Sequence, residues 1–191
     1  MIRKFAFEQL PLAGAWKITT FCADDNRGKF VKDYSAEAFA AAGIAYDLKE
    51  VFYTYSKAGV VRALHFQRVR EQAKLVRCVK GHVWDVIVDL RKESPTYRQW
   101  LAFDLTEENG VEILVPERFA HGYLVLEDSV VSYKCAEKFY GEYDDGIRWN
   151  DPDLAVAWPL EKIGGESQVI LSDKDLRLQS FAEWERTVRN V

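Results

Sequence analysis

The sequence predicts a mainly β protein, an all-β sandwich or barrel with a short helix near the N-terminus and another at the C-terminus. Short stretches rich in β-branched and aromatic residues follow one another, separated by brief turn signals such as Glu108-Asn109-Gly110. Such spacing is typical of sandwiches and barrels. No linker-like stretch divides the 191 residues, so we expect one domain over residues 1–191.

The N-terminal part predicts paired edge strands and then a helix. The expected elements are a first strand, a turn around Pro11–Gly14, a strand over Trp16–Phe21, a turn at Asp24–Gly28 and a strand over Lys29–Tyr34. A short helix should follow over Ser35–Ala42, because Ser35 is a suitable N-cap and Gly43 can end it.

The central part predicts the strands of the sandwich or barrel. They are Tyr46–Tyr55, Val60–Gln67, Lys74–Val79, Gly81–Leu90, Tyr97–Leu105, Val111–Val115, Gly122–Leu126 and Val130–Ala136. Alternation along His82–Leu90 places Trp84 and Val86 on one face and Asp85 and Ile87 on the other. Polar residues within such strands indicate an interior that is partly core and partly solvated cavity.

The C-terminal part predicts one helix on the outside of the barrel. Strand signals become sparse after Trp149–Pro152, and Ser172–Asp175 has the composition of a helix start. Leu178, Phe181 and Trp184 then follow at helical spacing.

Composition and charge exclude several classes of protein. A net charge of −4 argues against a nucleic-acid-binding protein, although it leaves room for a local basic pocket. No apolar run approaches the roughly 18 residues of a membrane span, and the N-terminus lacks the pattern of a signal peptide. Three cysteines far apart in sequence indicate a reducing compartment. We therefore expect a cytoplasmic protein with neither membrane nor nucleic-acid partners.

The strand Val60–Gln67 carries two residues that a buried strand does not need, Arg62 and His65. A buried cation must be paired or must meet an anion, and histidine is the usual proton carrier near neutral pH. A core histidine beside a surface arginine is the simpler alternative. Further cations within predicted strands are Lys74, Arg77 and Lys134. They indicate either an anionic ligand in the mouth of the barrel or plain exposure to solvent.

Other chemistries have weaker support. His65, His82 and His121 lack the close spacing of metal ligands, so we expect no metal. Cys78 and Cys135 lie in apolar strand patterns and should be inert. Proton transfer fits better, because His121 precedes Gly122, which allows close approach, and Tyr133 lies on the next strand. Tyr133 could equally be a core aromatic residue.

Five motifs taken together resemble those of dTDP-4-dehydrorhamnose 3,5-epimerases. They are R-A-L-H-F-Q (62–67), K-L-V-R-C-V-K-G (74–81), D-V-I-V-D-L-R-K-E-S-P-T-Y (85–97), P-E-R-F-A-H-G-Y-L-V-L (116–126) and G-I-R-W-N-D-P-D-L (146–154). Their order and spacing match across nearly the whole chain. The resemblance implies a cupin-like jelly-roll barrel, a homodimer with strands exchanged at the N-terminal side, and an isomerase that needs no cofactor.

The resemblance also implies the reaction and its residues. The substrate would be a nucleotide-linked 4-keto-6-deoxyhexose, epimerised at C3, C5 or both through an enolate. His65 would be the base, Asp175 of the motif L-S-D-K-D would orient it, and Tyr133 would be the acid. The substrate-binding residues implied in the same way are Arg27, Phe30, Glu50, Arg62, Lys74, His121 and Phe139.

Three positions depart from the family pattern. Ala63 replaces the usual glycine, Glu50 aligns with a usual glutamine, and Lys32 stands where the family usually has glutamate. An ionised Glu50 only accepts hydrogen bonds, and cytosine offers an exocyclic amine donor, so a CDP-linked substrate is one hypothesis. A Glu50–Lys32 pair is the other explanation. The alternative function is a non-catalytic cupin that binds a sugar nucleotide.

Overall fold

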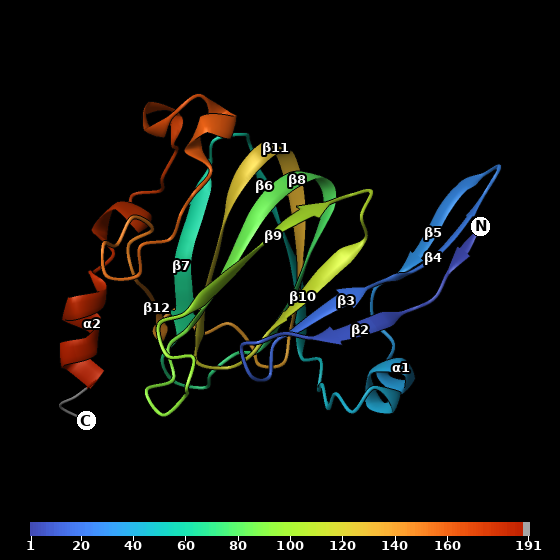
Figure 1. The fold of residues 1–191 in the computed structure, drawn as a ribbon, viewed down its shortest axis with the longest axis horizontal. Helices are drawn as coiled ribbons and strands as arrows, with labels where there is room; N and C mark the ends of the chain where they lie inside the picture. Colours follow the sequence, from blue (N-terminus) through green and yellow to red (C-terminus); the bar gives the residue numbers. More distant parts are fainter. Residues whose placement is uncertain (189–191) are drawn as a thin grey trace.

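The computed structural model describes residues 1–188 and shows a mainly β fold, as expected (Figure 1). The strands are β1 (Ile2–Arg3), β2 (Ala6–Gln9), β3 (Trp16–Thr19), β4 (Phe21–Asp25), β5 (Gly28–Lys32), β6 (Glu50–Ser56), β7 (Val61–Gln67), β8 (Lys74–Asp89), β9 (Trp100–Thr106), β10 (Val111–Val115), β11 (Phe119–Cys135) and β12 (Asp144–Gly146). The helices are α1 (Ala36–Ala41) and α2 (Phe181–Val188), with short 3-10 turns at Leu160–Ile163, Glu166–Gln168 and Asp175–Arg177.

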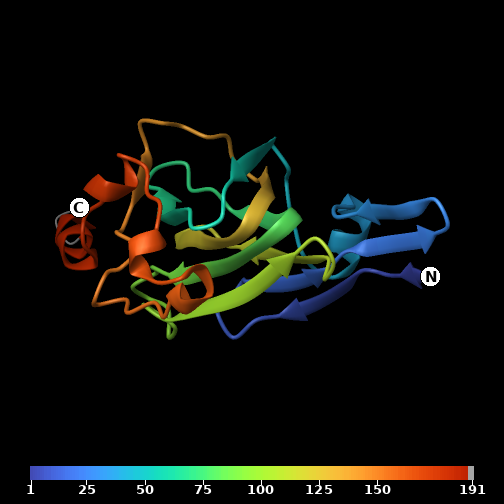
Figure 2. The same ribbon diagram turned by 90° about the horizontal axis from the view of Figure 1, so that it is seen from above.

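Antiparallel pairing builds a cupin-like barrel from one large sheet, in the order β12-β7-β11-β8-β10-β3-β2. Strand β6 also pairs with β11, and β9 with β8. A smaller sheet, β1-β4-β5, contains a hairpin that projects away from the barrel at the end opposite α2 (Figures 1 and 2).

The two longest strands correct the sequence prediction, which divided each of them in two. Strand β8 continues through Gly81, whose φ is +78° and whose missing Cβ leaves room for the Asp128 carbonyl. Strand β11 continues through Glu127 and Asp128, with register shifts against β8 at this point. The turn-like residues therefore form bulges that bend the long strands without ending them.

Two hydrophobic cores lie on opposite faces of β8, as its alternation predicted. Ile87 and Val83 belong to the core inside the barrel. Val86 and Val88 belong to the second core, which the C-terminal segment covers from outside. Five tryptophans gather in or against this outer core: Trp84, Trp100, Trp149, Trp158 and Trp184.

The helix predictions are confirmed at one end of the chain and wrong in position at the other. Ser35 caps α1 by accepting from the Ala38 amide, as predicted. Helix α2 packs on the outside of the barrel through Phe181 and Trp184, but it begins well after Ser172. Ser180 and Glu183 bond each other reciprocally and form the true helix start, a capping box. Among the described residues, no helix is long and apolar enough to cross a membrane.

Candidate active site

A cavity of about 260 Å³ opens where strands β6, β7, β8 and β11 meet the segment before α2. Most of its lining is polar or charged. The lining residues are Phe52, Thr54, Arg62, His65, Gln72, Lys74, His121, Tyr133, Phe139, Asp144, Ser172, Lys174 and Asp175. Seven of the ten predicted site residues are in this set, and Arg27, Phe30 and Glu50 are not.

His65 and Asp175 form a close pair, although they are far apart in sequence. Nε2 of His65 lies 2.7 Å from Oδ1 of Asp175, which is 6% exposed. Burial acts to raise the pKa of Asp175, but hydrogen bonds with His65 and Ser172 outweigh it and hold that pKa below its ordinary value. Nδ1 of His65 has no hydrogen-bond partner among the described residues. This nitrogen is also buried, so the ring has one nitrogen held by a carboxylate and one buried nitrogen without a partner.

His121 belongs to a second, fully buried pair beside the first. Its Nε2 lies 2.7 Å from Oδ1 of Asp85, and the two side chains are 3% and 0% exposed. His121 faces His65 directly across the β7–β11 ladder. Strand alternation predicted that Asp85 shares a face with Ile87, but the sequence indicated no role for it. The available signal was a carboxylate within an apolar strand, which must find a partner.

The Gly122 backbone explains how β7 and β11 approach so closely. A Cβ at Gly122 would lie 2.4 Å from the Ala63 Cβ and 2.7 Å from the Arg62 carbonyl oxygen. The close approach predicted for Gly122 is thus confirmed. The methyl of Ala63, which departs from the family glycine, occupies the space that Gly122 leaves open.

Tyr133 lies inside the barrel, and its ring stacks on Phe52 with centroids 4.7 Å apart. Its edge meets the His121 ring, 5.8 Å away. Burial, then the neighbouring Tyr123 and Asp85, raises the pKa of Tyr133 well above its ordinary value. The phenol is therefore neutral at physiological pH and has a proton to donate.

Two cations reach the cavity. Burial lowers the pKa of Lys74, while nearby Cys135 and Asp144 act in the opposite direction. Arg62 donates from Nε to the Ser56 hydroxyl over 3.0 Å. These two residues fit the prediction of an anionic ligand in the barrel mouth.

The other two predicted strand cations do not face the cavity. Arg77 and Lys134 lie on the opposite face of the sheet, because they alternate with cavity and core positions. Both contact Asp33, at 3.2 and 2.9 Å, and Lys134 also contacts Glu112 at 2.8 Å. They form a buried charge cluster with Asp33 and Glu112 and do not line this cavity.

The third histidine and two of the cysteines named from the sequence do not line the cavity. His82 pairs with Asp104 at 2.7 Å, and it is not among the residues that line the cavity. Cys78 and Cys135 are buried free thiols, as expected for core positions, and burial raises their pKa values to about 11 and about 12.

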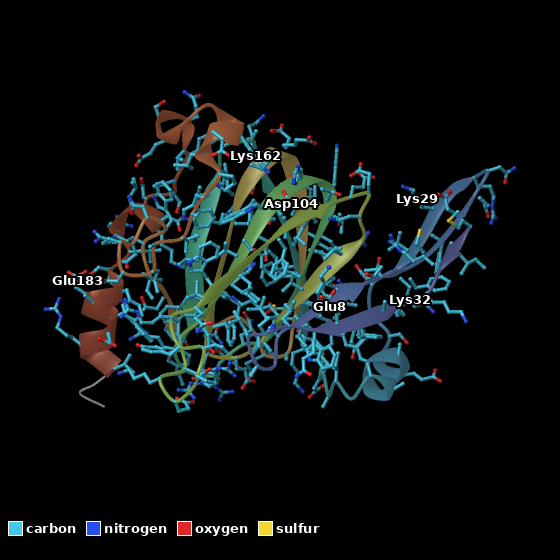
Figure 3. All side chains as sticks on the ribbon, viewed as in Figure 1. Glu8, Lys29, Lys32, Asp104, Lys162 and Glu183 are labelled. Atoms are coloured by element: carbon cyan, nitrogen blue, oxygen red, sulfur yellow. The ribbon has the colours of Figure 1, made fainter. Side chains whose placement is uncertain are left out.

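Glu50 lies at the rim of the cavity, and its contacts do not include Lys32. Glu50 Oε2 accepts a hydrogen bond from the Phe139 amide over 2.7 Å, and Phe139 is exposed. Lys32 lies on the projecting hairpin, with its ammonium 5.7 Å from the centre of the Phe21 ring (Figure 3). The Glu50–Lys32 pair considered from the sequence is therefore not formed within one chain.

Arg27 and Phe30 also lie on the β4–β5 hairpin and do not reach this cavity. The Arg27 side chain is 85% exposed and pairs with Asp25 at 2.7 Å, and Phe30 is exposed. The prediction that they bind substrate is not met within one chain.

Comparison with known proteins places the chain among isomerases of cupin-like fold. The family model for dTDP-4-dehydrorhamnose 3,5-epimerase matches residues 9–183, and the chain belongs to this family. The epimerase of Methanothermobacter thermautotrophicus is 42% identical over 181 residues, covering 94% of this chain and 96% of the relative.

Two solved structures of similar fold carry different named activities, a 3,5-epimerase and a 3'-monoepimerase. A 3,5-epimerase from Legionella pneumophila, in complex with dTDP-4-keto-L-rhamnose, has a TM-score of 0.86 at 34% identity and covers 93% of both chains. A 3'-monoepimerase from Streptomyces bikiniensis, in complex with dTDP-quinovose, has a TM-score of 0.85 at 28% identity and covers 94% of this chain and 89% of that chain.

Proposed function

We propose that the protein epimerises a nucleotide-linked 4-keto-6-deoxyhexose at C3, C5 or both, with His65 as base and Tyr133 as acid. The observation that carries the proposal is the His65–Asp175 pair at 2.7 Å in a cavity that also contains the buried Tyr133. A simple binding protein has no need of this combination.

His65 is suited to remove a proton from carbon. The C4 ketone of the sugar acidifies the hydrogens on C3 and C5. Asp175 orients the ring, and the imidazole of His65 accepts the proton while the C–H electron pair moves into the carbonyl and forms an enolate. Lys74, a cation of the cavity wall, stabilises the developing negative charge on oxygen.

Tyr133 is suited to return a proton from the other side of the sugar. In the cavity wall His121 lies between it and His65, facing His65 across the ladder and touching the Tyr133 ring edge. A sugar seated against His121 therefore has the base on one side and the neutral phenol on the other. Protonation from the side opposite to abstraction inverts the carbon.

Solvent exchange tests this proposal. Incubation of dTDP-4-keto-6-deoxyglucose with the protein in D2O should introduce deuterium at C3, at C5 or at both, as followed by proton NMR. The relatives include a 3,5-epimerase and a 3'-monoepimerase, so the labelled positions also define the type. Incorporation at neither carbon would overturn the proposal. A His65→Ala variant that still binds dTDP but exchanges no proton would separate binding from catalysis.

The nucleotide is proposed to be dTDP, by analogy with the ligands named for the relatives, with CDP as the competing candidate. Glu50 favours CDP, because its carboxylate at the cavity rim already accepts from the Phe139 amide and can accept again from a cytosine amine. Calorimetric titration with dTDP, CDP, GDP and UDP decides between them. A clear preference for dTDP would eliminate the CDP hypothesis.

A homodimer is the proposed assembly, with the hairpin of each chain completing the cavity of the other. The support is that Arg27 and Phe30, implied to bind substrate, project from the barrel on the β4–β5 hairpin (Figure 2). Exposed Val51, Tyr53 and Tyr55, which alternate along one face of β6, offer further apolar surface.

Complementation between two inactive variants tests the exchange. A chain lacking the base (His65→Ala) and a chain with an altered hairpin (Arg27→Ala, Phe30→Ala) should each be inactive. Random mixing of such dimers should restore about a quarter of the wild-type sites. No restoration, or a monomer by light scattering, would contradict the proposed assembly.

A further inference from the structure

The short strand β12 lies between the two segments that carry His65 and Asp175. On one edge it pairs with β7, with Gly146 opposite His65 and Asp144 opposite Gln67. A Cβ at Gly146 would lie 2.5 Å from the Leu64 carbonyl oxygen and 3.0 Å from a Leu178 methyl carbon. The glycine thus lets β7 and the segment before α2 approach β12 from both sides.

The other edge of β12 holds residues 172–179 at three places. The Lys174 ammonium contacts the Asp144 carboxylate. The Gln179 side chain donates to Asp145 Oδ1 over 3.0 Å, and the Arg148 amide donates to the Gln179 carbonyl over 2.9 Å. Asp175 follows Lys174 directly, so its position relative to β12 depends on these contacts.

Between Ser172 and Leu178 the segment around Asp175 has little regular structure of its own. It forms only a single 3-10 turn over Asp175–Arg177, and the Leu176 side chain is 66% exposed. Ser172 hydrogen-bonds Asp175, but both residues belong to the same segment and do not fix it to the barrel. The segment meets β7 directly at its start, where the Val61 amide donates to the Ile170 carbonyl over 3.0 Å. From Ser172 to Gln179, apart from the His65–Asp175 pair itself, the contacts with the barrel described above run through β12 and Arg148.

We infer that the Asp144–Lys174 ion pair fixes Asp175 against His65 and that Lys174 is a positioning residue of the proposed proton transfer. This inference rests on the proposed function for its catalytic meaning. The ion pair lies in the cavity wall, where the charged and titratable neighbours are Arg62, Lys74, His121 and Tyr133. The alternative role for Lys174, direct binding of the anionic nucleotide, has a different kinetic signature.

Kinetics of Lys174→Met and Asp144→Asn distinguish the two roles. Each variant should lower kcat for exchange about tenfold with KM changed less than about twofold, as expected for a base slightly out of place. The double variant should be no worse than either single one, and Lys174→Arg should recover most of the rate. A raised KM with unchanged kcat would overturn the inference in favour of nucleotide binding.

Lys162→Met is the matched control. Lys162 is 46% exposed, against 45% for Lys174, and it also contacts an aspartate, Asp104, at 3.8 Å (Figure 3). Neither Lys162 nor Asp104 lines the cavity. Exchange by this variant should equal that of the wild type.

A second measurement does not depend on activity. The chain has three histidines, so nitrogen NMR of the rings can be assigned with His82→Gln and His65→Ala variants and shows which nitrogen of neutral His65 carries the proton. In the wild type Asp175 should keep that proton on Nε2. Lys174→Met should shift His65 toward the mixture seen in Asp175→Asn, and Lys162→Met should not.

The two measurements separate the two claims. A wild-type protein that exchanges no deuterium but shows the ring shift in Lys174→Met overturns the proposed function and supports the positioning role. An active protein whose His65 ring is unchanged in Lys174→Met overturns the positioning role alone.

Discussion

Replacing Tyr133 by phenylalanine should separate proton abstraction from inversion. The change removes one oxygen and keeps the ring that stacks on Phe52 at 4.7 Å, so the barrel should stay folded. Without the phenol, the enolate formed by His65 has no acid on its far side. Inversion should then fall about 10²–10⁴-fold, the usual contribution of a positioned acid. Exchange should persist within about tenfold of the wild-type rate, because His65 can return a solvent-derived proton to the same face.

Proton NMR in D2O measures the rates of exchange and inversion in the same sample. Loss of the C3 and C5 proton signals reports exchange, and the signals of the new sugar report inversion. A Phe52→Leu variant, which disturbs the stack but keeps the phenol, should reduce both rates together. If exchange and inversion fall equally in Tyr133→Phe, Tyr133 is not the acid that this reasoning requires. Circular dichroism confirms that each variant is folded.

Three further predictions follow from other contacts. Burial, opposed by Lys134, raises the pKa of Glu112 from 4.5 to about 7, so the folded state binds this proton more tightly than the unfolded state. The stabilisation that protonated Glu112 contributes should therefore be lost as pH rises from 4.5 to 7; urea unfolding of Glu112→Gln should lack this decline, whereas Glu8→Gln on the surface should retain it. Gly122→Ala should cost about 3 kcal/mol by overpacking, even in an Ala63→Gly background, because the Arg62 carbonyl oxygen would still lie 2.7 Å away; unchanged unfolding midpoints would contradict this. Arg62→Gln should weaken dTDP binding about tenfold in calorimetry with kcat nearly unchanged, since a charged hydrogen-bond donor to the anion is lost; a fall in kcat alone would assign Arg62 a different role.

Local pattern was sufficient for most strands because alternation and turn residues act over a few neighbouring positions. It failed at Gly81 and Glu127-Asp128, where turn-like composition forms bulges within long strands. A bulge and a turn use the same residue types, and only the partner strand decides between them. The start of α2 was missed although Ser180 and Glu183 carry a capping box, because Ser172–Asp175 offered an earlier signal of the same kind.

In the candidate site, too, residues whose role depends on a distant partner could not be predicted from local pattern. His65, Asp175 and Tyr133 were predicted through the family resemblance, and the structure brings them to one cavity. Asp85 was missed because its role depends on a partner 36 residues away on another strand. Strand β12 was missed because three residues with two aspartates and a glycine have no strand character of their own. Its conformation is imposed by β7 on one side and by the segment before α2 on the other.

The positions of the tryptophans make intrinsic fluorescence a probe of how the C-terminal segment packs on the barrel. Five of the six tryptophans lie in or against the outer core beneath the C-terminal segment, and the sixth, Trp16, packs on a separate core with Phe39. None of them lines the ligand cavity. Intrinsic fluorescence should therefore follow detachment of the C-terminal segment from the barrel and stay nearly silent when a nucleotide enters. Ligand affinity must be measured by another signal, whereas undocking of the segment that carries Asp175 can be followed without any label.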